Sequence, residues 1–213
     1  MQAMIFANGN LSPETHIPDP AAYELIIAAN GGSDHCQRLD IQPDVLIGDL
    51  DSISQLTLEK WSQAGVEINQ HPRRKDKTDL EIALEVAHQR GAREIHVYGA
   101  LGDRLDMTLA NVYLLAHPSL PANVKLIRKQ EVVSVLRAQE TITLHGQPGD
   151  RVSLLPLDPR TRGITTEHLE YALQEETLEF GTSRGISNVM ERETATIALQ
   201  EGILCIVHTG LKN

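Results

Sequence analysis

The stretch VLIGDLDS at residues 45–52 combines an apolar run with two closely spaced acidic residues. A short apolar run that stops at a glycine, here Gly48, predicts a buried strand that meets a loop. Asp49 and Asp51 follow, and side chains two residues apart on an extended segment point the same way. We therefore expect two carboxylates just past a strand end, where ligands bind in open α/β sheets. Because such carboxylates repel without a cation between them, Mg²⁺ held together with substrate phosphates fits this position.

A second interpretation of the same stretch involves no ligand. Both acids can lie in a solvated turn, with Asp51 or Ser52 capping the helix that follows. For an isolated pair of acidic residues the second interpretation is the better one. Features elsewhere in the sequence are therefore needed to distinguish a ligand site from a solvated turn.

Composition narrows the class of protein. The chain has 213 residues, of which 41% are hydrophobic and 23% charged, as in a globular protein with a full core. The net charge of −10 argues against nucleic acid or an anionic membrane as the main partner. The chain has no apolar run of about 18 residues and no basic signal-peptide start, so we expect a cytoplasmic protein. Cys36 and Cys205 are then expected to be buried free thiols.

Asn30, Gly31 and Gly32 follow the apolar stretch 23–29, which predicts another buried strand. Two glycines after a strand let the backbone approach a ligand closely or turn tightly. Taken alone, an ordinary strand-to-helix turn capped by Ser33 or Asp34 explains this segment equally simply.

The charged segment at 71–79 leads into a well-defined helix start. Thr78 and Glu81 form a capping box, and an apolar helical stripe follows at residues 80, 83, 84 and 87. Asp79 lies in the first turn, where the helix dipole favours a negative group. Lys75 and Lys77 can meet phosphates there, although such charged runs are usually solvated loops.

A fourth strand end follows the predicted strand at 94–98. Gly102 and Arg104 lie in the turn before a helix marked by apolar residues at 105, 109, 112 and 116. A guanidinium at such a turn can clamp phosphate oxygens in pairs. Pairing between Arg104 and Asp106 is the competing explanation.

The alternation of strands and helices ends near Pro121. Up to that point it predicts a mostly parallel sheet with helices on both faces. Beyond it the chain consists of short apolar runs between turn residues, which predicts an all-β part, a sandwich or a barrel. We therefore expect an N-terminal α/β domain at 1–120 and a C-terminal β-sandwich domain at 121–213. The strands expected in the second domain are 124–127, 132–136, 141–144, 152–155, 169–173, 177–180, 195–199 and 203–207.

Four strand ends of the first domain thus carry residues suited to phosphate or metal. Each has an ordinary explanation, but their joint position on the carboxyl edge of one sheet is best explained by a magnesium nucleotide site. In the second domain a polar loop, Gly185 to Asn188, exceeds what a short hairpin turn requires.

These segments resemble the thiamine pyrophosphokinase family. The matching stretches are ANGGSD at 29–34, PDVLIGDLDSI at 43–53, DKTDLEIAL at 76–84, GALGDRLDMTLAN at 99–111 and GISN at 185–188. The resemblance implies a catalytic α/β domain, a thiamine-binding β-sandwich and a homodimer. It also implies that thiamine lies where the catalytic domain of one subunit meets the β domain of the other. The implied reaction converts ATP and thiamine into AMP and thiamine diphosphate.

The resemblance also assigns roles to residues of the motifs. Asp49, Asp51 and Asp79 are expected to bind Mg²⁺, and with Arg104 to form the catalytic set. The nucleotide and acceptor are expected to contact the remaining motif residues: Asn30, Gly31, Gly32, Ser52, Asp76, Lys77, Thr78, Asp106, Ser187 and Asn188.

The sequence departs from the family pattern at three places. Family members usually have aspartate at the position of Asn30, so a charge is lost there. Met107 stands where many bacterial members have histidine, and no aromatic residue in the segment 185–213 can stack on a thiamine ring.

Three other activities fit parts of the sequence. A related pyrophosphokinase could use another hydroxymethyl heterocycle, such as a pterin. An aspartyl-nucleophile phosphatase also has a DxD after an apolar strand, although normally after the first strand of its fold. A thiamine- or nucleotide-binding relative without catalysis is the third possibility, which the loss of charge at Asn30 suggests.

Overall fold

The computed structural model describes residues 1–51, 53, 55–102, 104–120 and 123–211, and the chain divides into two units, 1–129 and 130–213. The division lies after the strand β6 (Val124–Arg128), which was expected to open the β domain. β6 instead pairs in parallel with β5 (Glu94–Tyr98), because it completes a strand–helix–strand unit with α4 (Leu105–Leu114). The first unit therefore extends beyond the predicted boundary at residue 120.

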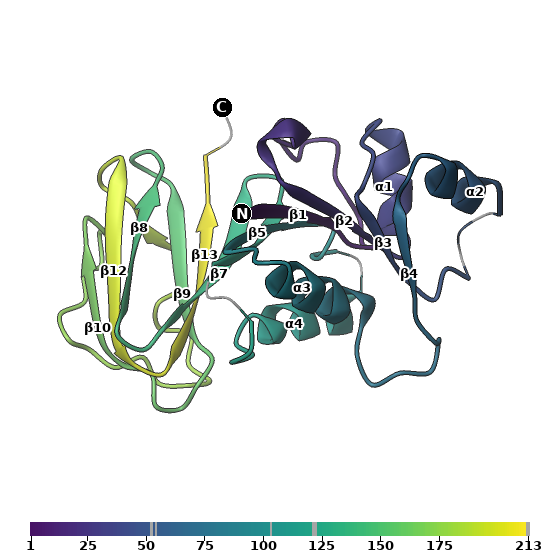
Figure 1. Ribbon diagram of the computed structural model, residues 1–213. Coiled ribbons are helices and arrows are strands. Elements are labelled where there is room, and N and C mark those ends of the chain that lie inside the picture. The colour runs from purple at the N-terminus through teal and green to yellow at the C-terminus, as the bar shows by residue number, and fades with distance from the viewer. Residues whose placement is uncertain (52, 54, 103, 121–122, 212–213) are drawn as a thin grey trace. The chain divides into compact units, whose positions relative to one another are not determined.

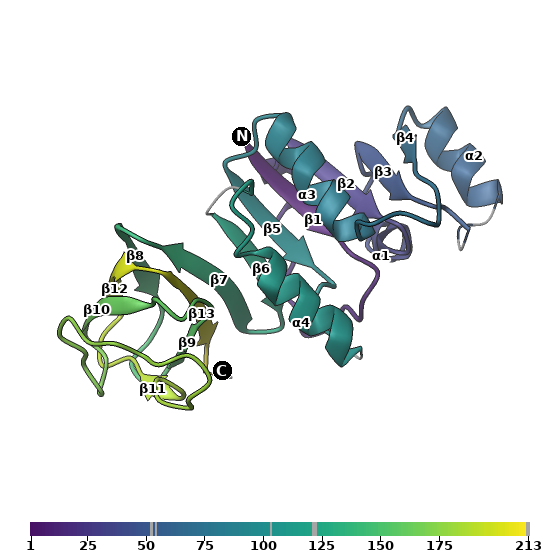
Figure 2. The same cartoon turned by 90° about the horizontal axis from the view of Figure 1, so that it is seen from below.

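The first unit is a parallel sheet with helices on both faces, as predicted (Figures 1 and 2). Its strand order is β6-β5-β1-β2-β3-β4, and every neighbouring pair is parallel. Helices α3 and α4 cover one face, and α1 lies on the other (Figure 1). The remaining elements are β1 (Gln2–Phe6), a 3-10 turn (Pro20–Ala22), β2 (Leu25–Ala29), α1 (Gly32–Arg38), β3 (Val45–Gly48), α2 (Gln55–Gln63), β4 (Glu67–Gln70) and α3 (Asp79–Gln89).

Burial explains why these segments form the sheet. Strands β2 and β3 are buried along their whole length, as expected for central parallel strands covered on both faces. On the α1 face, Met4, Phe6 and Leu46 pack with Cys36 and Trp61 in one apolar cluster. The carboxyl ends of the strands consequently reach one edge of the sheet, since all six run in the same direction.

The second unit is a pair of antiparallel sheets, as predicted for a sandwich. One has the order β11-β9-β13-β7 and the other β10-β12-β8, and their apolar side chains share a core. The strands are β7 (Glu131–Arg137), β8 (Glu140–His145), β9 (Arg151–Pro156), β10 (Arg162–Glu167), β11 (Asn188–Val189), β12 (Thr194–Glu201) and β13 (Ile203–Thr209).

Two predicted strands of the second unit, 169–173 and 177–180, are wrong, and two strands, β10 and the two-residue β11, were missed. Leu169, Leu173 and Leu178 are buried in the core from an irregular segment, in which Leu169 makes an isolated bridge with Met190. Their apolar character therefore reflects anchoring in the core and not membership of a strand. The missed strand β10 contains a glycine and two threonines, which mask its alternation. The polar side chain of Thr166 can be fully buried in this strand because its hydroxyl accepts a hydrogen bond from the backbone N–H of Leu173.

Both cysteines are buried and free, as predicted. Burial raises the pKa of each thiol to about 12, so neither is a reactive thiolate near neutral pH. Within the described part of the chain, no helix has the length and apolar character needed to cross a membrane.

A polar network lies on β5 within the first unit. The imidazole of His96 lies 3.0 Å from a carboxylate oxygen of Glu94 and 2.6 Å from the hydroxyl of Tyr23, and Lys125 pairs with the same Glu94 oxygen at 2.8 Å. A neutral ring that donates to Glu94 and accepts from Tyr23 satisfies all of these contacts. Burial lowers the pKa of His96, although Glu94 opposes that shift.

This network predicts a loss of stability in mild acid. Because the pKa of His96 in the folded chain lies below its ordinary value of about 6.5, the unfolded chain binds the proton more readily as the pH falls through that value. Thermal unfolding of the native protein and of His96→Gln should be compared at about pH 7.5 and about pH 5.5. We expect the melting temperature to fall further in the native chain than in the variant. Equal falls would show that protonation of His96 does not contribute.

Candidate functional site

The carboxyl ends of β2 and β3 bring Asn30 and Asp49 together, and the start of α3 adds Asp79. The amide nitrogen Nδ2 of Asn30 lies 3.0 Å from Oδ1 of Asp49 and 3.3 Å from Oδ2 of Asp79. Ionised carboxylates only accept hydrogen bonds, so the group facing both must be the amide N–H₂ and not the amide oxygen. The predicted convergence of these three residues is therefore observed, but Asn30 faces the acids as a donor and not as an oxygen ligand.

The start of α3 places Asp79 as the sequence predicts. The hydroxyl of Thr78 accepts a hydrogen bond from the backbone N–H of Glu81 and so caps the helix. Asp79 follows in the first turn, and Nζ of Lys75 lies 2.9 Å from its Oδ1 in a largely buried ion pair. The nearest cation to this carboxylate is thus a lysine from the loop before the helix.

Asp51 does not join the other two acids. The prediction assumed an extended backbone after β3, but Leu50 has a left-handed φ of 60° and a buried side chain. This turn leaves Asp51 exposed, and its closest described cation is Arg73 at 4.0 Å. Among the described residues, no group of three or more acidic, histidine or cysteine side chains could share a metal ion.

Asp49 and Asp79 still suit one mode of Mg²⁺ binding, in which the ion is shared with a phosphate ligand. Mg²⁺ in nucleotide sites is commonly held by one or two carboxylates, with phosphate oxygens and water completing its shell. The two acids gathered around Asn30 provide that number of protein ligands. The donor set therefore fits an ion that binds together with a phosphate ligand.

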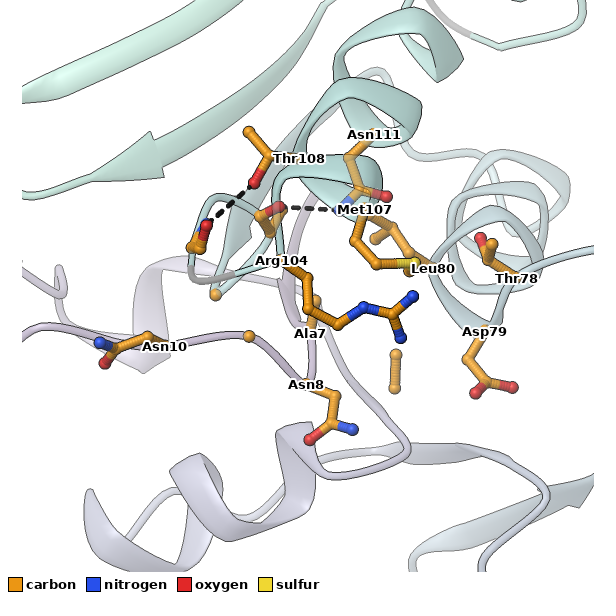
Figure 3. A pocket seen from close by; sticks show the side chains of 15 residues that line it. Ala7, Asn8, Asn10, Thr78, Asp79, Leu80, Arg104, Met107, Thr108 and Asn111 are labelled. Atoms are coloured by element: carbon orange, nitrogen blue, oxygen red, sulfur yellow. Dashed lines mark hydrogen bonds between the residues drawn. The ribbon is translucent and has the colours of Figure 1, made fainter.

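A pocket of about 280 Å³ adjoins this group of residues (Figure 3). Asp79 and Thr78 line one side and Arg104 another, with its guanidinium extending toward the space between Asn8 and Asp79 (Figure 3). The full lining comprises Ala7, Asn8, Gly9, Asn10, Ala29, Thr78, Asp79, Leu80, Gly99, Ala100, Gly102, Arg104, Met107, Thr108 and Asn111.

Arg104 is paired with Asp106, the alternative that the sequence left open. Two guanidinium nitrogens lie 2.5 and 3.2 Å from the carboxylate, and both side chains are mostly exposed. The pairing raises the pKa of Arg104 and lowers that of Asp106. An exposed pair of this kind contributes little stability, so an incoming phosphate can replace Asp106 at low cost.

The first strand end contributes residues that were not predicted for the site. Asn8 and Asn10 follow β1 and line the pocket, and they were not singled out from the sequence. Thr108 and Asn111 were also missed, and they shape the 99–102 loop. The hydroxyl of Thr108 bonds the backbone of Gly102, and the amide of Asn111 donates to the carbonyl of Ala100 at 2.7 Å (Figure 3). Thr108 and Asn111 are three residues apart on α4, so they lie on the same face of the helix. This spacing was the signal in the sequence that could have identified them.

Gly31 and Gly32 do not line this pocket; they allow α1 to approach β1. A Cβ atom on Gly32 would lie 1.9 Å from the backbone carbonyl oxygen of Phe6, and one on Gly31 would lie 1.9 Å from Oδ1 of Asn8. The helix begins at Gly32 without a side-chain cap, so the predicted capping by Ser33 or Asp34 is wrong. The paired glycines thus have a packing role in the structure.

Two other predicted residues, Lys77 and Asp76, lie in the loop before α3. Lys77 pairs with Glu85 at 2.6 and 2.8 Å, and Asp76 is exposed in the same loop. Ser52 lies outside the described residues. Their roles toward a nucleotide remain predictions.

Ser187 and Asn188 belong to the second unit, and they differ in character. Asn188 is buried, and its amide holds the backbone N–H and C=O of Tyr171 through two hydrogen bonds. Ser187 is exposed and has a left-handed φ of 60°. Asn188 therefore positions the Tyr171 segment, while the side chain of Ser187 is accessible to a ligand.

A pocket lies beside this loop, within the second unit. It is lined by Leu154, Glu170, Tyr171, Ala172, Leu173, Arg184, Gly185, Ile186 and Asn188. Tyr171 is 65% exposed, so its ring is available for stacking. The expectation from the sequence covered only the segment 185–213, which has no aromatic residue, and so did not include Tyr171.

Comparison with known proteins matches both units of the chain. The family described as thiamin pyrophosphokinase, catalytic domain, matches residues 21–128. The family described as thiamin pyrophosphokinase, vitamin B1 binding domain, matches residues 139–204. The two matches lie within the first and second unit respectively.

Individual relatives agree with these matches. The thiamine pyrophosphokinase of Bacillus subtilis (strain 168) is 26% identical over 92% of this chain and 94% of its own. A thiamin pyrophosphokinase family protein from Enterococcus faecalis has a similar structure, with a TM-score of 0.87 at 25% identity over the whole of both chains. The thiamin pyrophosphokinase of Geobacillus thermodenitrificans gives 0.84 at 27% identity, covering 100% of this chain and 99% of its own.

The packing role of the paired glycines can be tested by stability. Gly32→Ala places a methyl group against the rigid backbone of β1, so we expect it to lower the free energy of unfolding by about 3 kcal/mol. Gly31→Ala meets only the exposed side chain of Asn8, which can rotate away, so its loss should be smaller. Urea denaturation of both variants measures the difference. Equal, small losses would show that neither glycine is required for packing.

Proposed function

Because the chain belongs to the thiamine pyrophosphokinase family, we propose that it transfers diphosphate from ATP to the hydroxyl group of thiamine, giving thiamine diphosphate and AMP. The single observation that carries the assignment to these residues is the meeting of Asp49 and Asp79 around Asn30, next to a pocket that Arg104 lines. Two carboxylates and a guanidinium are what a bound magnesium triphosphate requires.

The phosphate-binding cations come from two loops of the first unit. Arg104 exchanges its exposed partner Asp106 for phosphate oxygens, which its planar fork binds in pairs. Lys75, already within 2.9 Å of Asp79, adds a second positive charge close to the acids. Lys77 serves the same purpose when it leaves Glu85.

Asp49 and Asp79 are the residues that would hold Mg²⁺ in this proposal. When bound there, Mg²⁺ would supply positive charge that neutralises the phosphate oxygens. The protein's own part is to position the hydroxyl group in line with the β-phosphorus. Asp51 or Asp79 accepts a hydrogen bond from that hydroxyl and so orients it; a strong base is not needed for phosphoryl chemistry of this type.

The acceptor site of the proposal lies in the second unit. Tyr171 offers an aromatic face, and Glu170 in the same pocket offers a negative charge. Thiamine carries a cationic thiazolium ring, which both groups attract. As the resemblance implies, we propose that a homodimer brings this pocket to the catalytic domain of the partner subunit, and that the protein works in the cytoplasm.

The reaction can be tested by product balance. Purified protein incubated with ATP, Mg²⁺ and thiamine should form thiamine diphosphate and AMP in equal amounts. Asp79→Asn removes a charge at the centre of the site, so we expect its turnover to fall on the order of 10²-fold or more. Glu59→Gln, which removes a charge from an exposed position on α2, is the matched control and should retain activity.

Other products would contradict the proposal and would each indicate a different activity. Turnover of ATP only with a pterin acceptor would move the substrate to another heterocycle. Release of inorganic phosphate without AMP would indicate a phosphatase. Binding of thiamine or ATP without any product would identify a relative that has lost catalysis.

The acceptor pocket gives a second test. Tyr171→Ala removes the aromatic face, and the loss of one stacking contact of about 1–2 kcal/mol raises the KM for thiamine roughly tenfold. The KM for ATP should not change, since the nucleotide site lies in the other unit. Tyr171→Phe keeps the ring and should behave like the native protein. An unchanged KM for thiamine in the alanine variant would exclude this pocket.

A further inference from the structure

The side chain of Asn30 lies between the carboxylates of Asp49 and Asp79. Its amide nitrogen contacts Asp49 at 3.0 Å and Asp79 at 3.3 Å, so one N–H can point to each carboxylate. The residue is only half-buried, as is each of the two acids. The arrangement joins three segments that are distant in the sequence: the ends of β2 and β3 and the start of α3.

The backbone holds Asn30 in this orientation. Its φ of 48° is left-handed, a conformation that asparagine adopts more readily than most residues. Its N–H donates to the carbonyl of Ile47 at 2.6 Å, and a Cβ atom on Gly48 would lie only 3.0 Å from its own Cβ. The side chain is therefore directed toward the acids by the pairing of β2 with β3.

The charge of the site explains what the amide contributes. Two carboxylates that share a position repel each other, and an unbalanced pair would move apart or take up a cation. The two N–H groups of Asn30 stabilise both carboxylates without adding net charge. Among the described residues, Lys75 provides the one full positive charge within salt-bridge distance of Asp79.

We propose that Asn30 is a positioning residue that keeps Asp49 and Asp79 together before any metal binds, so that the metal enters with the nucleotide and free Mg²⁺ binds only weakly. The inference rests on the proposed function for the identity of the metal and the nucleotide. The geometry on which it depends, an amide bridging two carboxylates, is independent of the substrate.

The test is thermal unfolding without nucleotide or thiamine, in EDTA and in Mg²⁺. Asn30→Asp has the same shape and also tolerates a left-handed backbone, but it places a third carboxylate where the donor was. Asn30→Gly keeps the backbone free of strain and removes the bridge without adding charge. Asn123→Asp adds the same charge at an exposed position before β6 and is the control for net charge.

We expect Asn30→Asp to melt about 3 °C or more below the native protein in EDTA, and to regain that loss in Mg²⁺. The native protein and Asn123→Asp should show little response to Mg²⁺ alone, whereas Asn30→Gly, whose two acids have lost the bridging amide, should be stabilised by Mg²⁺, though less than Asn30→Asp. Recovery by the ion would distinguish positioning of the acids from a merely structural role, since a packing defect would not be repaired by Mg²⁺.

Two results would overturn the inference. The first is a Mg²⁺-dependent rise in melting temperature of the native protein as large as that of Asn30→Asp. The second is an Asn30→Asp variant as stable as the native chain in EDTA. Because neither measurement includes a substrate, the inference can fail while the proposed reaction holds, and the reverse is also possible.

Discussion

Parallel pairing of the central strands is the constraint on which the first unit depends. Because β1, β2, β3 and β5 run in the same direction, the segments that follow them emerge at one edge of the sheet. Those segments carry Asn8, Asn30, Asp49 and Arg104. Residues separated by almost a hundred positions are thereby brought to one site, and no single loop has to contain the chemistry.

Close packing at the same edge limits what the loops can be. Helix α1 starts so near to β1 that a side chain at position 32 would meet the backbone of Phe6, while one at position 31 would have to displace the side chain of Asn8. The tight turn then fixes the backbone of Asn30 in its left-handed conformation, from which the amide reaches both acids. The close packing of α1 against β1 and the placement of the Asn30 amide therefore depend on the same segment, residues 30–32. This explains why Gly31 and Gly32 belong to the motif although they do not line the pocket of the first unit.

The second unit uses its loop in a comparable way. The buried amide of Asn188 fixes the backbone of Tyr171, and this places an exposed aromatic ring beside the Gly185–Asn188 loop. A rigid sandwich core supports the segment through Leu169 and Leu173. An accessible binding surface on an anchored loop is a common arrangement in proteins, because the scaffold bears the cost of ordering it.

The sequence alone determined the two-part fold, the helix start at Thr78 and the group of strand ends, since hydrophobic period, caps and glycines are local signals. It also marked Asp49, Asp79 and Arg104. Tertiary structure decided the rest: the left-handed turn at Leu50 that separates Asp51 from the other acids, and the pairing of β6 with β5. It also placed Tyr171 at the loop of the second unit. These features depend on backbone dihedral angles and long-range contacts, which the spacing of residues along the chain does not encode.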